Sequence, residues 1–131
     1  ETRFRLHLEA AERLCRPVVL HVVRSFEPVM KMLSEYRGLS GVVFHGFVGS
    51  VPQAERRWKA GYYLSFGERS LRSAKTREVI ARSPSPLIFC ETDDNPDCDI
   101  ADIFCEVAAL RGMSVEELRE QTAENYKNLI P

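Results

Sequence analysis

The sequence predicts an α/β fold in which helices cover a parallel β-sheet. Short β-branched, apolar runs, typical of strands buried on both faces, alternate with segments whose apolar residues recur at helical spacing. A helical segment separates each pair of successive strands, which favours right-handed parallel crossovers. Two architectures satisfy this order: an open parallel α/β sheet, or an arc of a (β/α)8 barrel, because closing a barrel takes about eight strands.

The first βα unit follows an amphipathic helix at the N-terminus. Residues 2–15 carry an apolar stripe at helical spacing, and Pro17 ends this helix. Residues 17–23 form a nearly continuous β-branched run, which predicts a strand covered on both faces. The next helix is expected to begin with Ser25 as its N-cap and to stop at Gly38.

Two further βα units are expected in the middle of the chain. The second unit comprises a strand over residues 41–47 and a helix over residues 51–60, with Ser50 as the N-cap. The third comprises a strand over residues 62–66 and a basic helix near residues 71–82.

The fourth strand and two helices complete the predicted order. The strand is expected over residues 87–91, and helices follow over residues 100–111 and 115–128. Ser114 and Glu117 have the spacing of a capping box, which predicts where the last helix begins.

Charge is unevenly distributed along the chain. The 131 residues carry a net charge of −1, but residues 1–90 contain 15 Lys and Arg against 8 Asp and Glu, whereas residues 91–131 contain 3 against 11. A basic portion can attract a polyanion, although solvated helix surfaces explain the same segregation. No apolar run reaches the roughly 18 residues that a membrane span needs. Four cysteines without C-x-x-C spacing indicate a reducing, cytoplasmic compartment.

Three polar residues stand where predicted strands end. His21 and His45 end the first and second strands, and Asp93 follows the fourth. The carboxyl ends of parallel strands meet at one edge of a sheet, and the two-residue period allows all three side chains to point into one space. Imidazole and carboxylate groups ligate Zn²⁺ and related divalent ions, so the pattern indicates a metal site. A single histidine at such a position is more often a hydrogen-bonded structural residue.

Four strings carry a family resemblance: PVVLHVVR at residues 17–24, VFHGFVGS at 43–50, GYYLSFG at 61–67 and ETD at 91–93. In order and spacing they resemble the second half of the TatD-related metal-dependent deoxyribonucleases, which have an amidohydrolase-type barrel. The resemblance covers nearly the whole chain. It implies the second half, strands 5–8, of a TIM-type (β/α)8 barrel with a C-terminal helix. We expect residues 1–131 to form a single domain, the C-terminal part of that barrel, with the N-terminal half absent from this chain.

The resemblance also implies roles for the strand-end residues. His21 and His45 match the histidines that hold the second metal, and Asp93 matches the aspartate that ligates the first metal and acts as the catalytic base. The implied cofactors are divalent metal ions, two in number, of Mg, Mn or Zn. The implied reaction is hydrolysis of a phosphodiester bond in DNA, or of another phosphate ester, by a two-metal-activated water.

The family's first-strand H-x-H pair and its bridging glutamate have no counterpart in these residues. We therefore expect the missing N-terminal half of the barrel, in cis or in trans, as a partner. Two alternatives to a nuclease stay open: an amidohydrolase-type hydrolase that cleaves a C–N bond in a small molecule, and a non-catalytic fragment or interaction module.

Supporting residues surround the candidate ligands. Arg24 is either a bidentate clamp on phosphate or a structural ion pair. Glu91 shares a strand face with Asp93, and we expect it to orient a ligand histidine rather than to bind the metal itself. The basic segment at residues 68–82 could guide a DNA backbone or form a solubilising face.

Overall fold

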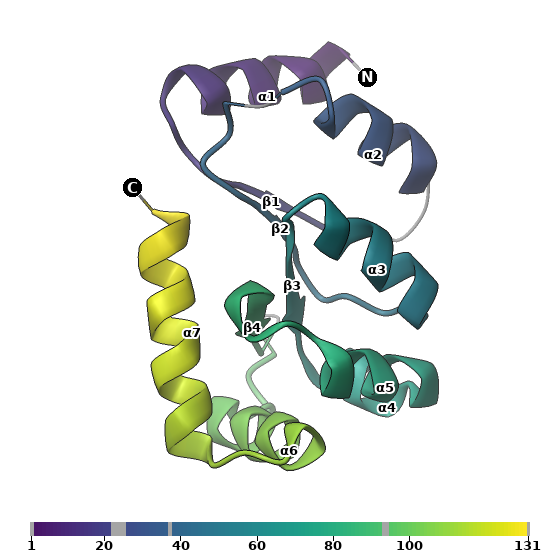
Figure 1. Ribbon diagram of the computed structural model, residues 1–131, viewed down its shortest axis with the longest axis vertical. Coiled ribbons are helices and arrows are strands. Elements are labelled where there is room, and N and C mark those ends of the chain that lie inside the picture. The colour runs from purple at the N-terminus through teal and green to yellow at the C-terminus, as the bar shows by residue number, and fades with distance from the viewer. Residues whose placement is uncertain (1, 22–25, 37, 93–94, 131) are drawn as a thin grey trace.

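The computed structural model describes residues 2–21, 26–36, 38–92 and 95–130. Within these residues, four short strands alternate with helices (Figure 1). The strands are β1 (Val18–Leu20), β2 (Val42–Phe44), β3 (Tyr63–Phe66) and β4 (Ile88–Cys90). The helices are α1 (Thr2–Arg13), α2 (Phe26–Leu33), α3 (Val51–Lys59), α4 (Glu68–Arg72), α5 (Ala74–Arg82), the 3-10 turn η1 (Ser85–Leu87), α6 (Ile100–Arg111) and α7 (Val115–Leu129).

The four strands form one parallel sheet in the order β1-β2-β3-β4. Each strand therefore lies beside its successor, as in an arc of a barrel, whereas a doubly wound sheet reverses its strand order at a switch point. Helices α3, α4 and α5 lie together on one side of this sheet, and α7 lies on the other side (Figure 1). The predicted parallel α/β fold is confirmed, and the strand order is that of a partial barrel.

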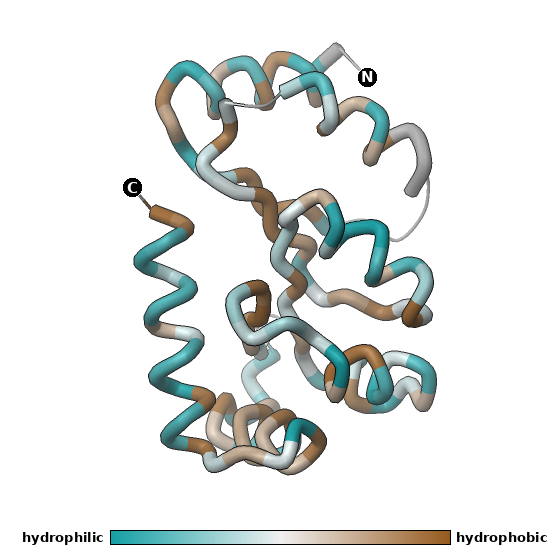
Figure 2. Tube along the Cα trace, in the orientation of Figure 1, coloured by the Kyte–Doolittle hydropathy of each residue, from teal (hydrophilic) through white to brown (hydrophobic). Residues whose placement is uncertain are grey.

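Alternate residues of the strands enter two different apolar clusters. Phe44, Leu64 and Ile88 belong to the large core between the sheet and its helices. Val43 and Tyr63 face the opposite side, where Leu129 from the end of α7 packs on them. Figure 2 shows the hydrophobic residues concentrated along the strands in the middle of the molecule, with α7 mostly hydrophilic.

The basic helix expected over residues 71–82 is two helices in the structure. Ser73 has an extended backbone, with φ −99° and ψ 119°, and it ends α4 and begins α5. Its Oγ accepts a hydrogen bond from the Thr76 N–H at 3.4 Å, because a serine side chain competes with the helical backbone at such a position. The prediction of one continuous helix was therefore wrong.

Other boundaries differ less from the prediction. Helix α1 ends at Arg13, and β2 ends at Phe44 because the chain turns at residues 45–46 instead of continuing as a strand. The capping box of α7 is confirmed: the Glu117 N–H donates to Ser114 Oγ, and the Ser114 N–H donates to Glu117 Oε1, both at 3.0 Å. Ser50 is the N-cap of α3, as predicted.

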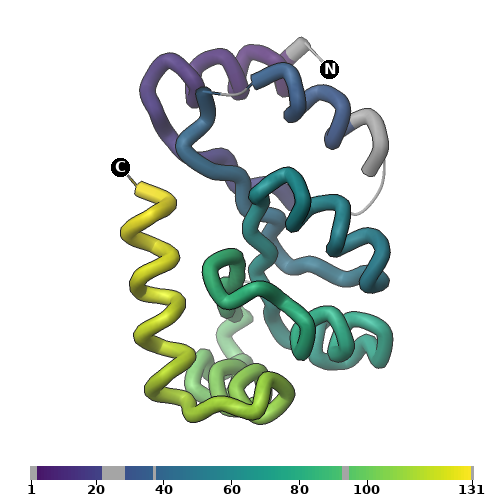
Figure 3. Tube along the Cα trace, viewed as in Figure 1, coloured from purple at the N-terminus to yellow at the C-terminus, as the bar shows by residue number. Residues whose placement is uncertain are grey.

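Buried polar side chains hold the connections between elements. Asn125 of α7 is fully buried, and its Nδ2 donates to the carbonyls of Ser85 at 2.8 Å and Ile88 at 2.9 Å. These two bonds fasten α7 to the start of β4. Figure 3 shows α7 alongside the strands, although α7 is far from β1, β2 and β3 in the sequence.

A second set of polar contacts fixes the loop between β2 and α3. Ser70 Oγ donates to the Phe47 carbonyl at 2.7 Å, and the Gly49 N–H donates to Thr76 Oγ1 at 3.0 Å. Both side chains are fully buried. The loop that follows His45 is thus anchored on α4 and α5. Among the described residues, no helix combines the length and the apolar character that crossing a membrane requires.

Candidate metal centre

His21 and His45 come together because their strands are in register. Leu20 pairs with Phe44 between β1 and β2, so the next residue of each strand lies at the same edge of the sheet. The His45 N–H continues this ladder by donating to the Leu20 carbonyl at 2.7 Å. The two imidazole rings have centroids 5.5 Å apart and planes tilted by 50°. The structure therefore brings two of the predicted ligands into one place.

Glu91 enters the same place from β4, two strands away from β2. Its backbone N–H donates to the Phe66 carbonyl at 2.9 Å, which keeps it in line with the strand ends. The Glu91 side chain is only 10% exposed; its Oε1 accepts a hydrogen bond from the Gly46 N–H at 2.7 Å, and its Oε2 lies 2.8 Å from Nδ1 of His45. A carboxylate with these contacts holds the His45 ring and the following turn together.

Two glycines make this contact possible. Gly67 follows β3, which lies between β2 and β4, and a Cβ there would stand 3.3 Å from Cγ of Glu91 and 3.2 Å from its carbonyl oxygen. The Glu91 side chain therefore crosses the end of β3 where no side chain obstructs it. Gly46 has a φ of +63°, a left-handed conformation that strains other residues, and a Cβ there would lie 3.5 Å from Cε1 of His21.

The contact between Glu91 and His45 has a consequence for the imidazole tautomer. Glu91 Oε2 and His45 Nδ1 are 2.8 Å apart, and an unprotonated Nδ1 would direct its lone pair at the carboxylate oxygen. Because the two lone pairs would repel each other, this contact favours a proton on Nδ1. The lone pair of the neutral ring is then on Nε2, as in histidines that ligate metals while a carboxylate orients them. Glu91 Oε2 is buried, and its contact with Nδ1 is close but outside hydrogen-bond alignment. This oxygen has capacity left to interact with a cation.

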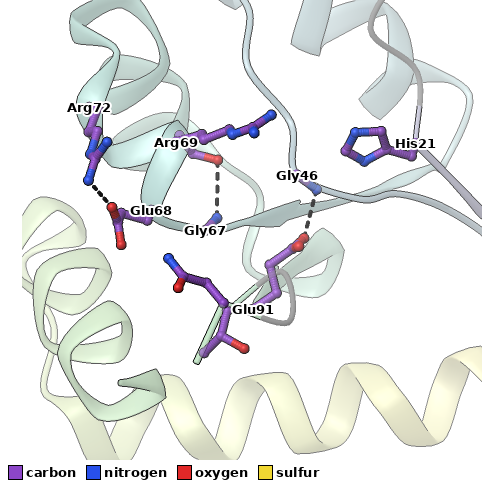
Figure 4. Close-up of a pocket in the computed structure, with 10 residues that line it drawn as sticks. His21, Gly46, Gly67, Glu68, Arg69, Arg72 and Glu91 are labelled. Atoms are coloured by element: carbon purple, nitrogen blue, oxygen red, sulfur yellow. Dashed lines mark hydrogen bonds and ion pairs between the residues drawn. The ribbon is translucent and has the colours of Figure 1, made fainter. Parts of the chain in front are cut away.

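A cavity of about 380 Å³ opens beside these groups. Figure 4 shows His21 and Gly46 on one side of it, Arg69 and Arg72 on the other, and Glu91 between them. Arg72 pairs with Glu68 four residues earlier on α4. Arg69 extends from α4 towards the side on which Gly46 and His21 lie.

The remaining predicted site residues, Asp93 and Arg24, lie outside the described residues. Within the described part of the chain, no group of three or more His, Cys, Asp or Glu side chains is arranged to hold a metal ion. Two adjacent imidazoles and a buried carboxylate nevertheless supply the nitrogen and oxygen donors that Zn²⁺ and similar ions use. The residues present fit a divalent metal centre that needs further ligands.

Cys90 stands beside the site but is not suited to nucleophilic catalysis. Burial raises the pKa of its thiol to about 12, so it stays protonated at neutral pH. A protonated thiol is a poor nucleophile, so Cys90 is not a candidate for nucleophilic catalysis.

Sequence reasoning missed the parts that Gly67 and Arg69 play. In the sequence Arg69 is only one of several basic residues in the segment 68–82, because its position relative to His21 depends on how α4 packs. A signal for Gly67 was present: it directly follows a predicted strand, where a missing side chain often marks a close approach.

Comparison with known proteins relates the chain to one family. The sequence model of the family described as TatD related DNase matches residues 1–131. The chain is 31% identical over 134 residues to the putative deoxyribonuclease TATDN3 of Mus musculus, covering 95% of this chain and 45% of that protein. It is also 31% identical over 138 residues to the uncharacterized metal-dependent hydrolase YjjV of Escherichia coli, covering 94% of this chain and 53% of that protein.

Solved structures agree with the sequence matches. The crystal structure of YjjV, a TatD homologue from Escherichia coli, superposes with a TM-score of 0.83 at 29% identity, over 94% of this chain and 53% of that one. An uncharacterized amidohydrolase from Saccharomyces cerevisiae superposes with a TM-score of 0.84 at 12% identity, over 96% of this chain and 58% of that one, and shows the fold alone. The chain thus spans about half the length of the relatives it matches.

Proposed function

This chain belongs to the TatD-related DNase family, and on that premise we propose that it supplies part of the active site of a metal-dependent hydrolase acting on phosphodiester bonds. The substrate in this proposal is DNA or another phosphate ester. The names of the curated relatives, deoxyribonuclease and metal-dependent hydrolase, support the reaction class. The observation that carries the proposal is the pair of imidazoles, 5.5 Å apart, beside the buried Glu91 carboxylate.

His21 and His45 are the proposed metal ligands from β1 and β2, and Asp93 is the proposed ligand and general base that follows β4. Glu91 holds His45 so that Nε2 carries the lone pair. Bound divalent cations, two of Mg²⁺, Mn²⁺ or Zn²⁺, would lower the pKa of a coordinated water and neutralise charge on the phosphodiester. Asp93 would accept the proton of the attacking water.

The proposal includes a second half of the barrel, in cis or in trans, that completes the ligand set. Strands β1 and β4 are the two edges of the four-stranded sheet. Large apolar side chains are exposed near these edges. Leu14, which precedes β1, is 68% exposed; Val19, within β1, is 62% exposed; and Tyr126 of α7 is 60% exposed. Unpaired strand edges with exposed apolar neighbours favour a covering segment. In this arrangement residues 1–131 are the C-terminal part of one domain.

Divalent-cation dependence tests the proposed reaction. The native polypeptide that carries this chain is stripped with EDTA, supplied with Mn²⁺, Mg²⁺ or Zn²⁺, and assayed on end-labelled DNA and on small amide substrates. We expect cation-dependent release of nucleotides, and a loss of about 100-fold or more in His45→Ala, since a ligand is removed. His7→Ala is the matched control, because His7 is exposed on α1 and should leave the rate unchanged.

Three results would contradict the proposal: hydrolysis that survives chelation, cleavage of amides in preference to DNA, or full activity of His45→Ala. Metal analysis provides an independent readout. Stoichiometric metal in the wild-type protein and its loss in His45→Ala are expected, whereas metal retention by both proteins would remove His45 from the proposed ligand set.

A further inference from the structure

Arg69 differs from the other charged residues that line the cavity. Arg72 is neutralised by Glu68 on the same helix, and Glu91 is engaged by His45 and Gly46. Arg69 lines the same cavity, yet it makes no hydrogen bond or ion pair within the part of the chain that the structure describes. Glu68 and Glu91 balance the two guanidinium charges of the described lining overall, but Arg69 is the arginine of this lining that has no ion-pair partner among the described residues.

The position of this cation relative to the candidate ligands is specific. Arg69 is the second residue of α4, two residues after Gly67, the glycine that allows Glu91 to cross β3. Its side chain points towards the side of the cavity on which Gly46 and His21 lie (Figure 4). Ser70, its neighbour, is fully buried and bonded to the Phe47 carbonyl, so the backbone that carries Arg69 is anchored to the loop after His45.

We propose that Arg69 binds a phosphate group of the substrate and positions that substrate against the histidine side of the cavity. A guanidinium group presents a planar fork of N–H donors that matches two phosphate oxygens, and it stays charged at any physiological pH. The inference rests on the proposed function and deepens it: the site accepts phosphate-bearing substrates, and Arg69 selects for that group. Arg69 is a positioning residue, and it takes no part in proton transfer.

A binding measurement tests this role separately from hydrolysis. The probe is a dinucleotide with a phosphorothioate linkage and a 5′-phosphate, which resists cleavage, titrated into the native polypeptide in the presence of Mg²⁺ by calorimetry. Unphosphorylated thymidine is the neutral comparison. We expect Arg69→Ala to weaken the affinity for the dinucleotide about tenfold, since one charged hydrogen-bonding partner is lost, and to leave the affinity for thymidine unchanged. The dinucleotide affinity of Arg69→Lys should lie between those of the wild type and Arg69→Ala, because lysine keeps the charge but not the planar fork of N–H donors.

Arg82→Ala is the matched control, because Arg82 is an exposed arginine of α5 paired with Glu78 and does not line the cavity. Its binding should equal that of the wild type. In turnover assays Arg69→Ala should raise KM about tenfold with a smaller change in kcat. Unchanged dinucleotide binding by Arg69→Ala, no binding by the wild type, or an equal loss in Arg82→Ala would overturn the inference.

The two proposals fail in different ways. If His45→Ala keeps its activity while Arg69→Ala loses dinucleotide binding, the proposed function is wrong and the phosphate site stands. If His45→Ala is inactive while Arg69→Ala binds the dinucleotide as the wild type does, the proposed function stands and the role of Arg69 is wrong.

Discussion

Glu91 Oε2 lies 2.8 Å from Nδ1 of His45, although the two residues follow strands that are separated by β3. The carboxylate reaches the imidazole past Gly67, and its other oxygen accepts from the Gly46 N–H. One side chain thus sets both the orientation of a candidate metal ligand and the conformation of the turn behind it.

Replacing Glu91 by Gln tests this relationship. The amide keeps the shape and can still accept from Gly46, but it removes the charge that favours a proton on Nδ1 of His45. Metal affinity should fall about 10- to 100-fold, as when other carboxylates that orient ligand histidines are changed. Isothermal titration with Mn²⁺ or Zn²⁺ measures it. The same change at the exposed Glu124 of α7 should have no effect, and an unaltered affinity of Glu91→Gln would show that His45 needs no such support.

The substitution Gly67→Ala, which adds a single methyl group, should displace Glu91. The new Cβ would lie 3.2 Å from the Glu91 carbonyl oxygen and 3.3 Å from its Cγ, so the neighbour must move by a few tenths of an ångström. The Gly67 backbone is extended, with φ −129°, so alanine adds no conformational strain there. Metal affinity and activity should fall about tenfold, since small displacements in such sites are costly, while the melting temperature changes little. A large drop in melting temperature with normal metal binding would contradict this expectation.

Asn125 should matter for stability rather than for binding. Asn125→Leu leaves the carbonyls of Ser85 and Ile88 buried without their donor, at a cost of about 2 kcal/mol in the free energy of unfolding. Urea denaturation followed by circular dichroism measures the difference. Asn128→Leu, at an exposed position on the same helix, serves as the control and should stay within about 0.5 kcal/mol of the wild type.

Cys90 should make stability depend on alkaline pH. Burial raises the pKa of its thiol in the folded protein from 9.0 to about 12, so between these values the unfolded chain loses the proton while the folded chain keeps it. The unfolded state then binds fewer protons, and stability falls as pH rises from about 9 towards 12. Denaturation at pH 8, 9 and 10 should show that the free energy of unfolding falls less steeply with pH in Cys90→Ala than in the wild type. Cys15→Ala is the control, because Cys15 is exposed, and equal slopes in all three proteins would refute the assignment.

Most of the architecture could be predicted because it depends on local pattern. The alternation of β-branched runs with amphipathic segments located all four strands, and the spacing of Ser114 and Glu117 located the start of α7. The break at Ser73 was not predicted, because the apolar residues on its two sides keep helical spacing while the serine side chain bonds back to Thr76. Whether a serine caps a helix or lies within it depends on what the neighbouring helices pack against.

The sequence by itself determined that His21 and His45 stand at the ends of successive strands, because strand position and side-chain period are local properties of the chain. Only the tertiary structure decided that Glu91 crosses β3 to reach His45 and that Arg69 faces the same cavity. These contacts depend on strand order, on register and on the packing of α4, which join residues more than twenty positions apart. No period in the sequence encodes such distances, so the shape of this site follows from packing.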